Sequence, residues 1–250
     1  MSPAVLNAAL PEPPAWPAAV WRADALGAPV QRAWPSGFAA LDAELPGGGW
    51  PGHALTELLS PHAGALEWRL LGPLLARLAA EGRDTLLVGP PQPPHPPGLC
   101  QLGVPARHLV WLCAQSPAER LWSTEQLIKA NPGGAVLAWL PQARPEQIRR
   151  LQVLAAGCET PVFVCRPEAV AREASAAPLR LRVRVAPGWA LMLDVLKRKG
   201  PPLDRPLPLH AMPAGLAAVL PPRLCDQPLP ASENPQVVVR PVPVPEHAVH

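Results

Sequence analysis

The hydrophobic positions of this chain follow two periods, which indicate alternating helices and strands along its middle. Leucines at helical spacing predict a helix over about 66–81, and Gly82 ends it. Ser116 and Pro117 predict the start of a second helix that runs to about Ala130, because serine caps a helix N-terminus and proline fits its first turn. Short apolar runs predict strands at 54–59, 85–88, 109–113, 135–140 and 161–165, with one more helix over 144–156.

A change of period follows this region. Residues 179–185 alternate strictly between apolar residues and arginine, which predicts a half-exposed strand. Pro187 and Gly188 predict a turn, and residues 189–196 return as a second strand. The pattern therefore predicts an α/β fold with a mostly parallel central sheet, helices on both faces and a C-terminal antiparallel hairpin.

Proline content divides the chain into three parts. Residues 1–20 are rich in Ala and Pro, and we expect a flexible N-terminus. Residues 21–205 are expected to form the folded domain, although 89–98 hold six prolines and are not expected to form a regular helix. Proline is dense again from residue 201 onward, which predicts a tail of low order over 206–250, with a short helix near 213–220.

Composition narrows the classes of function. Apolar residues make up 48% of the chain, enough for a sizeable core, and no apolar run reaches the ~20 residues that span a membrane. The net charge of +3 is too small to establish a nucleic-acid partner, so direct DNA contact stays open. The five cysteines form no C-x-x-C pair and the N-terminus has no signal-peptide pattern, so we expect buried, reduced thiols in a cytoplasmic protein. No metal-binding motif is found.

The region 35–60 carries the most specific motif of the chain. Ser36 is expected to cap a short helix, and a run of three glycines ends that helix in a turn. The region contains, in this order, Ser36-Gly37, Leu41-Asp42, Leu45, Pro46-Gly47-Gly48-Gly49, Pro51-Gly52 and Thr56-Glu57-Leu58. In order and spacing these residues resemble the entry to the RecA core, in which a short helix and a glycine-rich turn precede the first core strand.

Five segments carry a closer resemblance over roughly residues 20–205: Trp21-Arg22-Ala23-Asp24 and residues 35–60, 136–142, 144–147 and 194–202. Together they resemble the ImuA family of RecA- and SulA-like proteins associated with bacterial translesion synthesis. The resemblance implies a RecA-like core in a non-catalytic accessory protein of SOS-induced, error-prone translesion DNA synthesis. The partners that it implies are an ImuB-like Y-family protein and a DnaE-like polymerase, with RecA as a further contact.

A RecA-type ATPase next has a phosphate-binding loop, whose lysine reaches the outer phosphates and whose Ser or Thr holds Mg²⁺. The corresponding residues here are Ser60, Pro61, His62, Ala63, Gly64, Ala65, Leu66 and Glu67. By this resemblance Leu66 stands in place of the lysine and Glu67 in place of the Ser or Thr. The added carboxylate would repel phosphate by several kcal/mol in a partly desolvated site.

Two further departures point the same way. Gly89-Pro90-Pro91 stands where the water-activating glutamate is expected, and Trp139-Leu140-Pro141 stands where the metal-binding acid is expected. No lysine precedes Lys129, so no shift of the alignment restores the missing cation. We therefore expect no ATP hydrolysis, no catalytic residues and no cofactor. Binding of another anion by Arg69 or His62 stays open.

A basic region follows the expected sheet. Arg180, Arg182 and Arg184 share one face of their strand because side chains alternate with period two. Lys197-Arg198-Lys199 follows on the return strand. Two interpretations stay open: an exposed edge strand whose charges prevent aggregation, or a surface for a protein partner or DNA phosphates. Lys197 and Lys199 also resemble the two lysines that RecA proteins extend across the filament interface, which implies docking onto a RecA-like neighbour.

Two other functions remain as alternatives. A SulA-like inhibitor of cell division, which binds the tubulin-like division protein, shares the reduced RecA core. A nucleotide-dependent enzyme with an altered site is the third class. A nucleotide-binding titration distinguishes the enzyme from the two binding proteins, and the identity of the bound partner distinguishes those two from each other.

Overall fold

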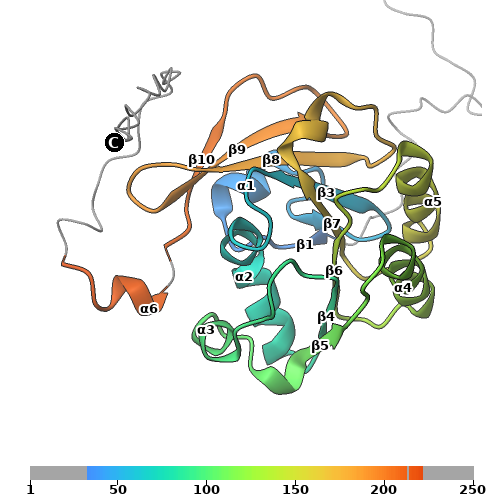
Figure 1. Cartoon of the computed structure of the whole chain (residues 1–250). Helices are drawn as coiled ribbons and strands as arrows, with labels where there is room; N and C mark the ends of the chain where they lie inside the picture. Colours follow the sequence, from blue (N-terminus) through green and yellow to red (C-terminus); the bar gives the residue numbers. More distant parts are fainter. Residues whose placement is uncertain (1–32, 213, 222–250) are drawn as a thin grey trace, which may run out of the picture. The chain divides into compact units, whose positions relative to one another are not determined.

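The computed structural model describes residues 33–212 and 214–221, and its main feature is an eight-stranded sheet (Figure 1). The strand order is β10-β9-β8-β3-β7-β6-β4-β5. The strands are β3 (Leu55–Ser60), β4 (Thr85–Val88), β5 (Leu109–Leu112), β6 (Ala135–Trp139), β7 (Val162–Pro167), β8 (Leu179–Val185), β9 (Ala190–Lys197) and β10 (Leu207–His210). Neighbours from β8 to β5 pair in parallel, whereas β8–β9 and β9–β10 pair antiparallel.

Helices connect the strands, and a separate two-stranded sheet precedes them. The helices are α1 (Ala39–Glu44), α2 (Leu66–Ala80), α3 (Pro96–Gln101), α4 (Pro117–Ala130), α5 (Pro145–Ala155) and α6 (Ala214–Ala217), with 3-10 turns η1 (Ala106–His108) and η2 (Glu168–Arg172). The small sheet pairs β1 (Ala33–Trp34) with β2 (Trp50–Pro51). The prediction of an α/β fold with a mostly parallel sheet, flanking helices and a C-terminal antiparallel hairpin is confirmed.

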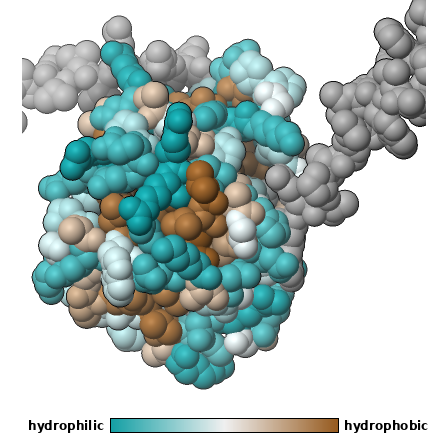
Figure 2. Space-filling view, turned by 90° about the vertical axis from the view of Figure 1, so that its right-hand side faces the viewer, coloured by the Kyte–Doolittle hydropathy of each residue, from teal (hydrophilic) through white to brown (hydrophobic). Residues whose placement is uncertain are grey.

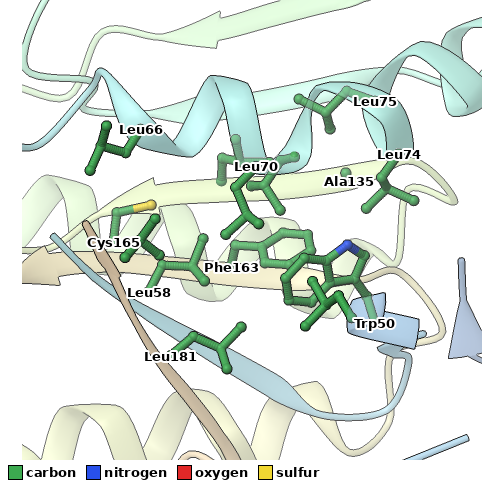
Figure 3. Packing of buried hydrophobic residues seen from close by; sticks show 14 of the residues in the cluster. Trp50, Leu58, Leu66, Leu70, Leu74, Leu75, Ala135, Phe163, Cys165 and Leu181 are labelled. Atoms are coloured by element: carbon green, nitrogen blue, oxygen red, sulfur yellow. The ribbon is translucent and has the colours of Figure 1, made fainter. Parts of the chain in front are cut away.

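The core has two layers, one on each face of the sheet. The first contains the leucines of α2 together with Leu41 of α1 and Leu99 of α3. Figure 3 shows part of this layer, where Trp50 and Phe163 meet edge to face with ring centroids 5.3 Å apart. The second layer lies under α4 and α5. Helices therefore cover both faces of the parallel part of the sheet, which explains why strands such as β4 and β6 are mostly apolar.

Sequence patterns located most elements within one or two residues, but not the start of the first helix. Ser36 is not its cap, because α1 begins at Ala39 after Phe38. The Ser36 hydroxyl instead accepts a hydrogen bond from the Phe38 N–H at 3.0 Å, and the Ser36 N–H donates to Asp42 at 2.8 Å. The short helix itself is present, as predicted.

The proline-rich stretch and the expected tail also need correction. Helix α3 begins inside the stretch 89–98, because its prolines occupy first-turn positions that need no N–H donor. Strand β10 lies within 206–250, where low order was expected, and pairs with β9 from Leu207↔Leu193 to His210↔Ala190. The predicted helix near 213–220 is present as α6. The expectations for residues 1–20 and 222–250 lie outside the described residues.

The cysteine prediction was partly wrong. Cys158 and Cys165 are buried, but Cys100 and Cys113 are exposed. Cys225 lies outside the described residues. Within the described part of the chain, no helix is both long and apolar enough to cross a membrane.

Candidate functional site

The segment 60–67 joins the carboxyl end of β3 to the first turn of α2, where parallel α/β sheets commonly bind ligands. Gly64 adopts a φ of +85°, and a Cβ there would lie 2.7 Å from Pro91 Cγ. The turn therefore passes close to the proline-rich segment that follows β4, and it needs glycine. The exposed residues of this segment are Pro61, His62, Ala63 and Ala65.

The carboxylate of Glu67 is buried and folds back onto its own loop. Its Oε2 accepts a hydrogen bond from the Gly64 N–H at 2.9 Å, and its Oε1 accepts one from the Ser60 hydroxyl at 3.2 Å. Burial raises the pKa of Glu67 above its ordinary value of 4.5, against the lowering effect of these hydrogen bonds. The loop's own acid therefore occupies donors that an incoming anion would need.

The side chain at position 66 points into the core rather than to the exposed part of the loop. Leu66 is 4% exposed and packs in the same cluster as Leu70 and Cys165 (Figure 3). Burial, with a smaller contribution from the charge of Glu67, raises the pKa of the Cys165 thiol well above its ordinary value of 9.0. A cation at position 66 would have to enter this apolar layer.

Two hollows border the loop. One has a volume of about 140 Å³, and its lining includes Ser60, Pro91 and Trp139. The other has a volume of about 420 Å³, and its lining includes Gly64, Arg69 and Pro91. Pockets for drug-sized ligands usually measure roughly 300–1,000 Å³, so only the second hollow has that size. The neighbouring Arg69, which sequence analysis left open as an anion ligand, donates to the carbonyl of Ala211 at 3.1 Å and to that of Trp189. His62 is exposed, so the structure does not bring the two residues together in a buried site.

A larger hollow of about 520 Å³ lies at the starts of α4 and α5. Its lining includes Gln115, Arg120, Gln142, Arg144 and Gln147. Sequence analysis missed this hollow because two loops that are distant in sequence form it. The Arg120 side chain is partly held in place, since its Nε donates to the Ala114 carbonyl at 3.2 Å.

The three arginines of β8 share one face, as predicted, but β8 is not an edge strand. It lies between β3 and β9, so an exposed edge strand is excluded. Arg180 is 6% exposed, and its Nε donates to Glu57 Oε2 at 2.5 Å. Its other donors bond to the carbonyls of Val170, Ala171 and Glu173. Arg180 is therefore not available to an outside partner.

Glu57 is the centre of a buried ionic network that sequence analysis missed. It is fully buried on β3, and its second oxygen accepts from Arg166 of β7 at 2.8 Å. Arg166 also bonds to the Ala143 carbonyl at 2.6 Å and to Glu173 at 3.1 Å. A glutamate inside the apolar run 54–59 was the sequence signal for this network, since a buried charge needs a partner.

The remaining arginines of β8 are mostly neutralised by acids. Arg182 and Arg184 both donate to Asp194 Oδ2 at 2.9 Å, and Arg182 also lies 3.3 Å from Glu168. These side chains are 30% and 40% exposed. The predicted basic face therefore exists only in part, because most of its charge serves internal ion pairs.

The three basic residues of the Lys197-Arg198-Lys199 segment differ in how far their charges are bound within the molecule. Arg198 is held by the carbonyl and carboxylate of Glu44 and by the carbonyl of Pro201. Lys197 is exposed and donates to the Ser175 carbonyl at 2.8 Å, and Lys199 is exposed just after the end of β9. Of the six predicted partner-binding candidates, the two lysines present the most accessible charge.

Comparison with known proteins assigns no family, since neither the family models nor the curated proteins contain a match to this chain. Among the described residues, no group of three or more His, Cys, Asp and Glu side chains could hold a metal ion.

Proposed function

We propose that this chain is a non-catalytic accessory protein with a RecA-like core, related to the ImuA family and acting in SOS-induced translesion DNA synthesis. Its partners in this proposal are an ImuB-like Y-family protein and a DnaE-like polymerase, with RecA as a further contact. The entry motif of residues 35–60 and the mostly parallel sheet that follows it support the RecA-like part of the proposal.

The observation that carries the non-catalytic part is the placement of Glu67. Its carboxylate accepts the Gly64 N–H and the Ser60 hydroxyl, which are the kinds of donor that a phosphate would need. The apolar surroundings of Leu66 add to this argument. A buried acid and an absent cation disfavour a nucleoside triphosphate on electrostatic grounds.

Binding rather than chemistry is then the mechanism. The ionic network at Glu57 joins β8 to β3 and β7, and β9 pairs with β8. The exposed Lys197 and Lys199 at the end of β9 provide a positively charged docking point. A partner that carries acidic groups at the matching position would be steered toward these lysines.

A pull-down with purified full-length chain tests the proposal. We expect capture of the ImuB-like protein and no capture of the tubulin-like division protein. The reverse result would overturn the proposal in favour of the division inhibitor. Titration with a fluorescent ATP analogue should show no saturable binding, and saturable binding with hydrolysis would establish an enzyme instead.

A further inference from the structure

The two edges of the eight-stranded sheet differ in how they are protected. At one edge, β10 carries Pro208, which has no N–H to offer an additional strand. At the other edge, β5 has the sequence Leu-Val-Trp-Leu, with neither proline nor charge. Proline and charged residues are the usual means by which proteins keep an edge strand from pairing further. Among the described residues β5 pairs only with β4, so its outer edge is open in this part of the chain.

Both faces of β5 are also incompletely covered. Val110 is 42% exposed and Trp111 is 43% exposed. Val110 pairs with Leu86 of β4, and Trp111 pairs with Leu87 of the first core layer, so the two side chains lie on opposite faces of the sheet. Figure 2, which shows the molecule from the side of α4 and α5, displays brown apolar areas among hydrophilic side chains. An added strand with apolar residues on both faces would cover Val110 and Trp111 together.

The chain itself contains one short run of matching chemistry. Residues 236–240 read Gln-Val-Val-Val-Arg, lie between Pro235 and Pro241, and contain no proline. Three consecutive β-branched residues favour an extended strand and place apolar side chains on both of its faces. The two flanking prolines would limit pairing to about the length of β5, since neither can donate to a ladder.

Shortly before its described end at residue 221, the chain passes α3, the helix that precedes η1 and β5. Gly215 of α6 lies against the side chain of Gln101, the last residue of α3, and η1 leads from there into β5. Residues 222–235 connect this point to the valine run. At about 3.3 Å per extended residue, they can cover roughly 45 Å. We propose that residues 236–240 pair with the open edge of β5 in the same molecule as a ninth strand of the sheet.

Cysteine cross-linking in the full-length chain tests this pairing. Cys113 is exposed and directly follows β5, so it is a native reporter at one end of the strand. Cys100→Ser and Cys225→Ser remove competing thiols. In this background Gln236→Cys and Arg240→Cys are introduced one at a time, and each variant is treated with oxidised glutathione. Ala231→Cys, outside the valine run, is the matched control. We expect the cysteine at either position 236 or position 240 to form a disulfide with Cys113 about tenfold faster than the control position does. Strand pairing would raise the effective concentration of that thiol at Cys113.

The reactive position also gives the direction of pairing. A parallel strand brings residue 240 to Cys113, and an antiparallel strand brings residue 236 there. Equal rates for all three positions would overturn the proposal, as would a disulfide that forms only between two chains, which indicates exchange with a second copy. A further Cys113→Ser substitution should abolish the product.

Hydrogen exchange gives an independent readout without any added thiol. Val238→Pro removes a donor from the centre of the run, so the outward amides of β5 should exchange faster than in the unaltered chain. Ala231→Pro is the control and should leave them unchanged. Identical exchange of β5 in both variants would contradict pairing by residues 236–240.

Discussion

At the scale of single residues, the buried carboxyl of Glu67 gives its loop a pH-dependent contribution to stability. A buried carboxyl with a raised pKa binds its proton more tightly in the folded chain than in the unfolded chain. Its contribution to folding stability therefore falls as the pH rises from the ordinary value of 4.5 through the raised pKa. The hydrogen bonds from Ser60 and Gly64 reduce this effect without cancelling it.

Glu67→Gln should flatten this part of the pH dependence. The amide has the same shape and does not ionise, so the loss of stability above pH 4.5 should be smaller than in the unaltered chain. Urea unfolding at half-unit steps from pH 4.5 to about 7.5 measures how the free energy of unfolding falls with pH. Glu146→Gln, at an exposed carboxylate, is the control and should keep the original slope. Parallel curves for Glu67→Gln and the unaltered chain would contradict the assignment.

Asn131 combines two roles at the end of α4. It adopts the left-handed conformation with a φ of 46°, which suits asparagine and glycine. Its Oδ1 accepts hydrogen bonds from the Cys158 thiol, from the N–H groups of Glu159 and Thr160 and from the Thr160 hydroxyl. One side chain therefore organises the turn that leads into β7.

Asn131→Gly separates these roles, because glycine keeps the backbone conformation and removes only the acceptor. We expect a loss of about 1–3 kcal/mol in the free energy of unfolding, from donors left without their partner. Chemical denaturation measures it. Asn131→Ala should lose more, since alanine also opposes the positive φ. A neutral Asn131→Gly would mean that water replaces the lost acceptor.

At the scale of elements, the Glu57 network connects β3, β7, β8 and η2 in the interior. Arg180→Leu removes one partner and leaves the Glu57 carboxylate with Arg166 alone. It also removes the donors to three carbonyls in and after η2. Breaking a buried pair in this way should cost about 3–5 kcal/mol.

Arg184→Leu provides the matched control on the same face of the same strand. Its guanidinium is 40% exposed, so the loss should be about 0–1 kcal/mol. Thermal and urea unfolding of the Arg180→Leu and Arg184→Leu variants measure the two losses in the free energy of unfolding. Similar losses would show that the network around Glu57 stabilises the fold no more than the partly exposed pair of Arg184 and Asp194.

These elements also show what sequence can and cannot predict. The alternation over 179–185 placed Arg180, Arg182 and Arg184 on one face correctly, because the period of a strand is local. It did not reveal that β8 lies inside the sheet, because strand order depends on contacts between distant segments. Position 67 could be identified as an acid in the loop, but its bond to Gly64 depends on the fold of the turn.

At the scale of the whole molecule, the proposed docking point is tested by function. If Lys197 and Lys199 contact a RecA-like neighbour, the full chain should inhibit RecA strand exchange, and Lys197→Ala/Lys199→Ala should weaken that inhibition. Lys129→Ala is the control, because Lys129 is an exposed lysine on α4. Unchanged inhibition in the double variant, or none with any protein, would contradict this contact. Added salt should weaken the effect in the same direction.

The central position of β3 has a consequence for how the chain is made. Strand β3 ends at Ser60, but its neighbours β7 and β8 begin only at Val162 and Leu179. A ribosome that adds about 5–20 residues per second needs roughly 5–25 s to synthesise that interval. During this time β4, β5 and β6 can already pair with one another, but the Leu-Thr-Glu-Leu-Leu-Ser strand lacks both of its neighbours. Nascent chains of this protein should therefore depend on chaperone binding during translation, and their native sheet should form only once the arginine-rich hairpin has left the ribosome.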